Sequence, residues 1–235
     1  MPVENKFPEF GLGRNPSIPD ENNKRFMAMA SPDAQNIVYK THFTDQLLDQ
    51  GSTPECTAYA AVGAMVAAPI RNFPNISLHD LYKLNQKFDR WPGDAYEGSS
   101  VHGACIALKS LGLISEYRWA TTIDQVVDYV LTKGPMMVGT TYYNRMFTPD
   151  KQGFLHPEGG EAGGHAYLII GCNRNAKGPN GAIGTLSIVN SWGRRWGKED
   201  RAGNKNGRAL ITFDAFEMLL KDQGEAAVIV EKKLN

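Results

Sequence analysis

The stretch that decides the fold reads Asn190-Ser191-Trp192-Gly193-Arg194-Arg195-Trp196-Gly197. The β-branched and apolar run from Thr185 to Asn190 leads into this stretch and predicts a strand that ends at Asn190. An asparagine at a strand end can accept the N–H of a histidine ring and set its orientation and tautomer, and an indole can shield that hydrogen bond from water. An ordinary strand-to-loop transition with aromatic packing is the alternative interpretation.

A histidine stands earlier in the chain at the start of another apolar run. The segment Gly163-Gly164-His165 leads into the run from Ala166 to Cys172, which predicts a strand. The glycines leave open space beside the backbone, and the histidine could act as a general base and as the ion-pair partner of a thiolate. A structural histidine at a strand edge is the alternative.

A cysteine opens the most apolar segment of the first half. The run from Cys56 to Ile70 consists mainly of small apolar residues and predicts a buried helix. Pro54 and Glu55 suit the start of a helix. The positive end of the helix dipole favours the thiolate, which is the nucleophilic form, whereas Glu55 by itself raises the pKa of the thiol. A small buried core residue is the alternative interpretation of Cys56.

The remaining pattern separates helices from strands. Helical periodicity and caps predict helices after Ser77 and over 101–111, 122–131 and 213–221, and short β-branched runs predict strands over 136–141, 166–172, 185–190, 209–213 and 226–231. The fold class is therefore α+β. We expect an irregular N-terminal arm at 1–40, a mainly helical lobe at 41–134 and a mainly β lobe at 135–235.

Composition excludes several classes of protein. The chain has 25 Lys+Arg and 25 Asp+Glu, so nothing in its net charge favours nucleic acid or an anionic membrane as a partner. We expect no transmembrane segment and no signal peptide. The three cysteines do not form a disulfide framework, which favours a reducing compartment. The histidines show no metal-ligand spacing, and we expect neither a metal nor an organic cofactor.

Three motifs in this order resemble the papain family of cysteine peptidases: Gln50 with Cys56 six residues later, then Gly164-His165-Ala166, then Asn190-Ser-Trp-Gly-Arg-Arg-Trp-Gly197. The resemblance runs from about residue 34 to the C-terminus. It implies a two-lobe fold, with a helical lobe and an antiparallel β-barrel-like lobe that enclose the active-site cleft.

The resemblance also implies roles for individual residues. Cys56 would be the nucleophile, His165 the base and acid, Asn190 the residue that orients the histidine, and Gln50 an oxyanion donor. The substrate would contact Trp192, Gly98, Ser99 and Gly164.

The expected function is hydrolysis of peptide bonds in a peptide or protein substrate through a thioester acyl-enzyme. Missing disulfide cysteines and a missing long pro-segment resemble bacterial or viral members, so we expect a cytoplasmic or virion-associated protein; any assembly partner is unknown. The alternatives are a non-catalytic papain-like module, for example in a phage particle, and a Cys–His amidase or acyltransferase. We expect the arm to wrap the other lobe rather than to occlude the cleft.

Overall fold

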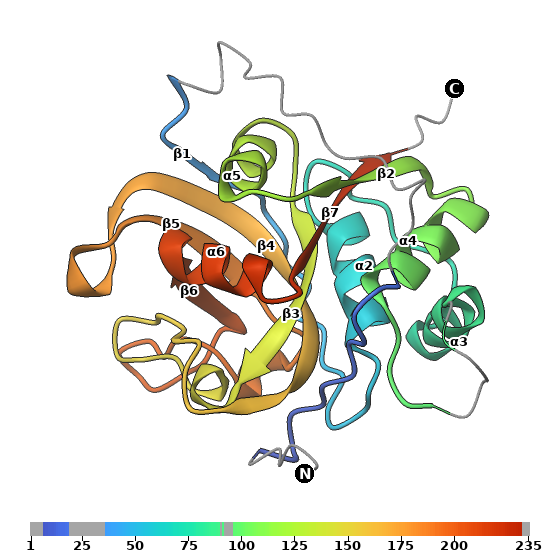
Figure 1. The fold of residues 1–235 in the computed structure, drawn as a ribbon, viewed down its shortest axis with the longest axis horizontal. Coiled ribbons are helices and arrows are strands. Elements are labelled where there is room, and N and C mark those ends of the chain that lie inside the picture. Colours follow the sequence, from blue (N-terminus) through green and yellow to red (C-terminus); the bar gives the residue numbers. More distant parts are fainter. Residues whose placement is uncertain (1–6, 19–35, 90, 92–95, 232–235) are drawn as a thin grey trace.

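The computed structural model describes residues 7–18, 36–89, 91 and 96–231. It combines helices with an antiparallel sheet against which they pack (Figure 1). The α-helices are α2 (Cys56–Val66), α3 (Leu78–Phe88), α4 (Val101–Ser110), α5 (Ile123–Thr132) and α6 (Phe213–Lys221). The strands are β1 (Tyr39–Thr41), β2 (Ile114–Ala120), β3 (Met136–Tyr143), β4 (Glu161–Lys177), β5 (Ile183–Val189), β6 (Arg208–Thr212) and β7 (Glu225–Glu231). This confirms the predicted α+β class.

The sheet runs in the order β2-β7-β3-β4-β5-β6, and β1 pairs with β4 outside this path. Every pair is antiparallel. The long strand β4 pairs with β3 on one edge and with β5 on the other, so it links distant parts of the chain. One end of β4 carries His165, and this is also the end at which β5 runs out into Asn190.

Side-chain caps start four of the helices. Ser77, Ser100, Thr122 and Thr212 each accept a hydrogen bond from a backbone N–H in the first turn of the helix that follows. Such caps satisfy N–H groups that have no partner inside the helix. Helix α2 differs, because its N-cap residue Glu55 makes no side-chain cap bond. Its first turn therefore keeps backbone donors that can serve another purpose.

The sheet separates two hydrophobic cores. Ala166, Leu168 and Ile170 of β4 pack with α2, α3 and α4, whereas Tyr167 and Ile169 pack in the other core with side chains of α5 and α6. This alternation follows from the two-residue period of a strand. In Figure 1, α2, α3 and α4 gather on one side of the sheet. A residue near the end of β4 can therefore contact the start of α2.

Two strands do not follow from the sequence pattern. Strand β1 falls at the end of the expected irregular arm, and β2 lies in a segment for which the sequence predicted no element; both form by pairing with residues far along the chain. Helix α5, which lies in the expected helical lobe, packs its buried side chains in the core that contains β3 to β6. The lobe boundary at residue 134 stays a prediction.

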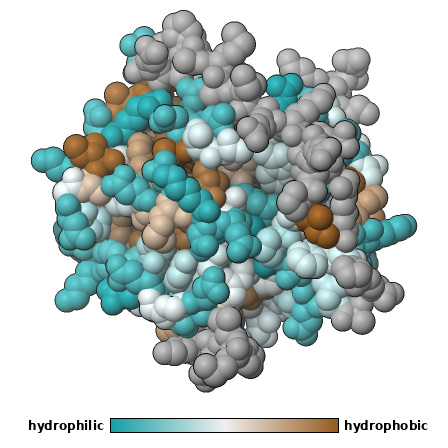
Figure 2. Space-filling model, in the orientation of Figure 1, coloured by the Kyte–Doolittle hydropathy of each residue, from teal (hydrophilic) through white to brown (hydrophobic). Residues whose placement is uncertain are grey.

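The face of the molecule in Figure 2 is mainly polar where the structure describes it. Figure 2 shows hydrophobic side chains in separate groups among hydrophilic ones, a distribution that is usual for globular proteins. Within the described residues, each helix is too short or too polar to cross a bilayer.

Candidate active site

Cys56 is the first residue of α2, and its side chain is fully buried. Helix α2 packs against β4, which brings the thiol to the backbone of that strand. The Ala166 N–H donates a hydrogen bond to Sγ of Cys56 at 3.3 Å. Ala166 directly follows His165, so this contact places the thiol close to the residue that carries the imidazole. Cys56 and Ala166 lie 110 positions apart in the sequence.

The imidazole of His165 is held by Asn190. Nε2 of His165 lies 2.7 Å from Oδ1 of Asn190, and both side chains are buried. An amide oxygen only accepts, so Nε2 carries the hydrogen and donates it. The second ring nitrogen, Nδ1, is buried and has no hydrogen-bond partner among the described residues. This tautomer leaves the Nδ1 lone pair free to take a proton.

Aromatic side chains surround the histidine. The Trp192 indole stacks on the His165 ring, with centroids 4.5 Å apart and planes 16° from parallel. Tyr142 meets the same ring edge-on at 5.0 Å, and Trp196 packs edge-on against Trp192. Because Trp192 is fully buried, this arrangement excludes water from the hydrogen bond between His165 and Asn190.

Gln50 lies beside the site and is fixed by both ends of its amide. Its Nε2 donates to the Thr53 carbonyl at 2.7 Å, and its Oε1 accepts from the Ser191 hydroxyl at 2.6 Å. A primary amide has two N–H groups, so one remains beyond the bond to Thr53. The contact with Ser191 ties Gln50 to the residue that follows Asn190.

Burial keeps both members of the Cys–His pair neutral. Burial raises the pKa of the Cys56 thiol to about 12, against the opposing influence of the Ala166 N–H and the Arg14 charge. Burial also lowers the pKa of His165 to about 4, although the bond to Asn190 opposes this shift. In this closed site, Cys56 is therefore a thiol and His165 a neutral imidazole, rather than the thiolate and imidazolium considered from the sequence.

Glu55, which precedes the thiol in sequence, turns its carboxylate toward α3. Its Oε1 lies 2.7 Å from Nδ1 of His79. The carboxylate is thus engaged with His79 on α3.

The site is covered by the chain's own N-terminal residues. Residues 7–18, here called the arm segment, lie between Ser99 on one side and Gly164 on the other, in the space that we call the cleft. The N–H groups of Gly13 and Arg14 donate to the Gly164 carbonyl at 3.0 and 2.9 Å. The Gly13 carbonyl accepts from the Ser99 N–H at 2.8 Å. The expectation that the arm wraps the other lobe is wrong for these residues.

All four residues expected to bind substrate contact the arm segment. Besides Ser99 and Gly164, the Trp192 indole N–H donates to the Gly11 carbonyl at 3.0 Å. A Cβ at Gly98 would meet the Gly13 carbonyl oxygen at 2.3 Å. The residues predicted from the motifs are thus brought together around one extended peptide, which is a segment of the same chain.

The arm segment approaches the loop before Cys56 more closely than a side chain would allow. A Cβ at Gly13 would lie 2.3 Å from the Pro54 carbonyl oxygen, and the φ angle of Gly13 is +128°. A Cβ at Gly11 would lie 2.1 Å from the Thr53 carbonyl oxygen. Only glycine fits at such backbone contacts. The close cover accounts for the complete burial of Cys56 and His165.

Comparison with solved structures identifies the architecture. The chain superposes on xylellain, a cysteine protease from Xylella fastidiosa, with a TM-score of 0.73. The match covers 99% of each chain at 18% identity. The chain has the papain-like fold. ProCathepsin B S9 from Trypanosoma congolense matches with a TM-score of 0.64 at 10% identity over 96% of this chain and 88% of that one. Digestive procathepsin L 3 of Tenebrio molitor gives a TM-score of 0.60 at 14% identity over 95% and 77%.

Sequence similarity is confined to a shorter segment. No family model matches the chain. The cathepsin B-like cysteine proteinase 5 of Caenorhabditis elegans is 30% identical over 83 residues, which make up 35% of this chain and 23% of that protein. The structural match to xylellain thus covers nearly the whole chain, whereas the sequence match to the Caenorhabditis elegans protein covers about a third of it.

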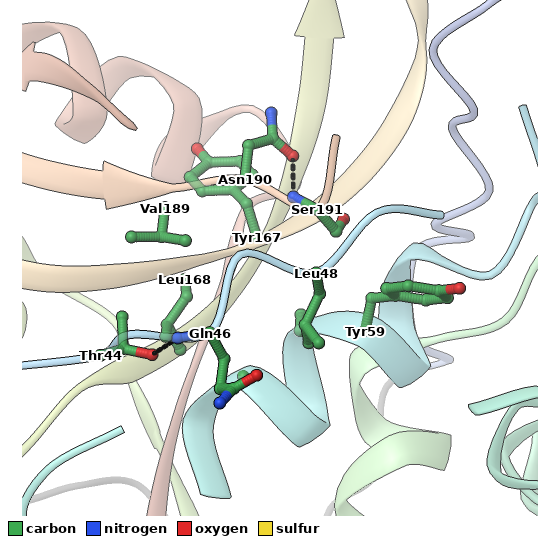
Figure 3. Close-up of a pocket in the computed structure, with 11 residues that line it drawn as sticks. Thr44, Gln46, Leu48, Tyr59, Tyr167, Leu168, Val189, Asn190 and Ser191 are labelled. Carbon is green, nitrogen blue, oxygen red and sulfur yellow. Dashed lines mark hydrogen bonds between the residues drawn. The ribbon is translucent and has the colours of Figure 1, made fainter. Parts of the chain in front are cut away.

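A small hollow lies beside Asn190 and Ser191. Figure 3 shows side chains from the segment before α2, from α2, β4 and the end of β5, and from the two residues after β5 around it. Oδ1 of Asn190 accepts from the Ser191 N–H. Its volume is about 20 Å³, which suffices for about one water molecule. This hollow cannot hold a peptide, so the cleft filled by the arm segment is the candidate site.

Sequence analysis missed three residues of this site. Tyr142 packs on His165, and Arg14 of the arm segment forms an ion pair with Glu225 at the start of β7. None of them stands in a motif. The spacing Gly11-Leu12-Gly13 was the available signal for a close backbone approach in the arm.

Proposed function

We propose that the chain is a cysteine peptidase that cleaves peptide bonds through a thioester on Cys56. One observation carries the proposal: His165 donates through Nε2 to Asn190 and keeps Nδ1 free, while Sγ of Cys56 lies against the next residue of the same strand. The papain-like fold, shared with known cysteine proteases, supports the same chemistry.

The chemistry follows from the free nitrogen. Nδ1 of His165 takes the thiol proton as Sγ attacks the substrate carbonyl carbon, and the same proton goes to the amine as the C–N bond breaks. The acyl group is then held as a thioester. His165 next takes a proton from water, whose oxygen attacks the thioester and releases the acid and the thiol.

Two donors are suited to the negative oxygen that forms on the carbonyl. The backbone N–H of Cys56 lies at the start of α2, where no side chain caps the helix. The second N–H of the Gln50 amide is the other candidate. A single donor of this kind contributes about 3–4 kcal/mol to lowering the barrier.

Activity requires the arm segment to leave the cleft. The segment uses the hydrogen-bonding groups of Ser99 and Gly164 that an extended substrate would need. Its departure admits water to Cys56 and His165, and both pKa values then move back toward their ordinary ranges. The arm-covered form is thus proposed to be a latent state of the peptidase.

Labelling of the thiol tests this proposal. All three cysteines are buried in the arm-covered form, so a thiol-directed epoxide, followed by mass spectrometry, should modify Cys56 when the arm segment opens and leave Cys105 and Cys172 unmodified. Arg14→Ala, which removes the ion pair of the arm with Glu225, should speed the labelling, and Cys56→Ala should abolish peptide turnover. Absence of both labelling and turnover in the native chain and in Arg14→Ala would reject the peptidase.

A non-catalytic papain-like module is the second candidate. It is favoured by the complete burial of the neutral Cys56 and His165 beneath the arm segment. A module of this kind would keep its binding partners after Cys56→Ala. Loss of biological function in Cys56→Ala, with folding unchanged by circular dichroism, would argue against it.

A further inference from the structure

The two walls of the cleft are built differently. Gly164, on one wall, lies in β4 and is paired with Thr141 of β3. Ser99, on the other wall, belongs to residues 96–100, here called the rim segment, which precedes α4. Within the described residues, the rim segment lies in no strand, and its backbone bridge is to Arg14 of the arm segment. Contacts other than a sheet ladder must therefore fix its position.

Side chains from one face of α3 hold the rim segment. Tyr82, Gln86 and Asp89 stand four and three positions apart, so they lie along one side of the helix and its C-cap. The Gly98 N–H donates to the Tyr82 hydroxyl at 2.8 Å. Nε2 of Gln86 donates to the carbonyls of Tyr96 and Gly98 at 2.9 and 3.0 Å. The backbone of the rim segment is thus hydrogen-bonded to α3 rather than to a neighbouring strand.

Asp89, the C-cap residue of α3, binds both ends of the rim segment. Its Oδ2 accepts from the Tyr96 hydroxyl at 3.1 Å. Its Oδ1 accepts from both the N–H and the hydroxyl of Ser100. Hydrogen bonds to a carboxylate are charge-assisted and stronger than neutral ones. Because Gly98 and Ser99 lie between these two ends, Asp89 fixes the part of the rim segment that the arm segment contacts.

The start of α4 leaves room for this carboxylate. Ser100 is also the N-cap of α4 and accepts from the Gly103 N–H at 2.8 Å. A Cβ at Gly103 would lie 2.3 Å from Oδ1 of Asp89 and 2.7 Å from the Asn85 carbonyl oxygen. Burial raises the pKa of the Asp89 carboxyl, and the hydrogen bond from Ser100 opposes this rise. A partly buried carboxylate is unfavourable unless its oxygens accept hydrogen bonds, so Asp89 needs the donors that the rim segment supplies.

The rim segment pairs with the main chain of the arm segment. The Ser99 N–H donates to the Gly13 carbonyl, and the Ser99 carbonyl accepts from the Asn15 N–H, both at 2.8 Å. Such pairing depends on position, because hydrogen bonds weaken steeply as their angle departs from linearity. An extended peptide that replaces the arm segment would meet the same two groups of Ser99.

We propose that Asp89 is a positioning residue of the cleft. Through Tyr96 and Ser100 it holds Ser99 where the main chain of a bound peptide pairs with it, whether that peptide is the arm segment or a substrate. The part of this proposal that concerns a substrate rests on the proposed peptidase function. Asp89 acts through the rim segment and not on the reacting atoms.

Alkylation of the three cysteines tests the proposal without turnover. In Asp89→Ala the rim segment loses its charged acceptor, so the arm segment should leave the cleft more often. The rate of Cys56 alkylation by iodoacetamide should rise by about tenfold or more, because hydrogen bonds to a charged group are lost. Cys105 and Cys172, which are buried in the two cores, should keep their slow native rates. Mass spectrometry of the digested protein measures all three rates.

Asp80→Ala is the matched control. Asp80 is an exposed aspartate at the opposite end of the same helix, where it accepts from the Ser77 hydroxyl at 2.6 Å. This variant should be alkylated like the native chain. Asp89→Asn keeps the size of the side chain and one acceptor oxygen, so it should give an intermediate rate and guards against loss of the whole fold. The proposal is overturned if Cys56 reacts in both Asp89 variants as it does in Asp80→Ala, or if all three cysteines react faster in both.

Steady-state kinetics separates positioning from the chemical step. Gly13→Ala strains the arm segment against the Pro54 carbonyl and serves as the parent. Adding Asp89→Asn should raise KM for a peptide substrate by about tenfold and change kcat by less than about threefold, because the pairing with Ser99 is made in the bound substrate and in the transition state alike.

The two measurements fail independently. Turnover in Gly13→Ala with a KM that Asp89→Asn leaves unchanged would reject the positioning of substrate and keep the peptidase. Faster alkylation of Cys56 in Asp89→Ala, without turnover of any peptide in Gly13→Ala, would keep the positioning of the arm segment and reject the peptidase.

Discussion

At the scale of single residues, Asn190 determines which nitrogen of His165 is free. Its Oδ1 accepts from His165 and from the Ser191 N–H at 2.8 Å. Asn190→Ala leaves these buried donors without an acceptor. We expect the free energy of unfolding to fall by about 2 kcal/mol.

The same substitution should act on the chemical step. The imidazole of Asn190→Ala has no fixed tautomer, so kcat should decrease by about tenfold or more while KM changes less. Steady-state kinetics on a peptide substrate measures both. The control Asn173→Ala removes an amide whose Oδ1 accepts from the N–H of the exposed Asn175, away from the site. An equal loss of kcat in both variants would contradict the role of Asn190.

His165 also makes stability depend on pH. Its pKa falls from 6.5 to about 4 on folding, so between these values the unfolded chain binds a proton that the folded chain does not. The stabilisation by the neutral buried ring is complete above pH 6.5 and is lost as the pH falls toward 4.

The slope of this dependence is a testable quantity. Over this range the free energy of unfolding should rise with pH by about 1.4 kcal/mol per unit more in the native chain than in His165→Gln. Denaturant titrations at several pH values measure the difference, in which carboxyl groups common to both proteins cancel. Equal slopes in the two proteins would show that the ring is not held neutral.

At the scale of elements, the arm segment depends on a glycine. A Cβ at Gly13 would lie 2.3 Å from the Pro54 carbonyl oxygen. The φ angle of Gly13, +128°, is also one that residues with a side chain rarely adopt. Backbone strain of this kind costs on the order of 1–3 kcal/mol. Gly13→Ala should therefore shift the arm segment out of the cleft.

Alkylation of Cys56 measures that shift. We expect the rate in Gly13→Ala to rise by about tenfold, in line with that strain energy. Gly203→Ala is the matched control, because Gly203 also has a positive φ angle, +83°, yet a Cβ there meets nothing within 4 Å. A similar rate in both variants would mean that close packing of Gly13 does not hold the arm segment.

At the scale of the whole molecule, the arm segment should open without unfolding of the two cores. Its hydrogen bonds to Ser99 and Gly164 and its ion pair with Glu225 are separate from the ladder between β4 and β5. A single segment can open locally at a lower free energy than the whole fold, and opening here also withdraws Phe10 from its contacts with Phe147 and Trp192.

Hydrogen exchange in Arg14→Ala tests this independence. The amides of Gly13, Arg14 and Ser99 should exchange faster, while the ladder of β4 and β5 keeps its native protection. Arg118→Ala, which breaks a partly exposed pair with Glu116, should leave all of these amides unchanged, because such pairs contribute little. Faster exchange throughout the sheet would show that the arm segment is part of the global fold.

Most of the fold was predictable from local pattern. The helix that begins at Cys56, the strand that contains His165 and the strand that ends just before Asn190 all have strong periodicity or clear end signals. Strands β1 and β2 were not predictable from local pattern, because their residues form strands through pairing with β4 and β7. Tyr142 likewise stands in a strand that gives no hint of its contact with His165.

The sequence by itself determined the α+β class and the three motif segments, since hydrophobic period, caps and chemically distinctive residues are properties of neighbouring positions. Tertiary structure alone decided that the arm segment covers the cleft, that burial keeps Cys56 and His165 neutral, and that Arg14 meets Glu225 across 211 residues. These features depend on desolvation and on partners brought together by folding, and no local run of residues specifies either.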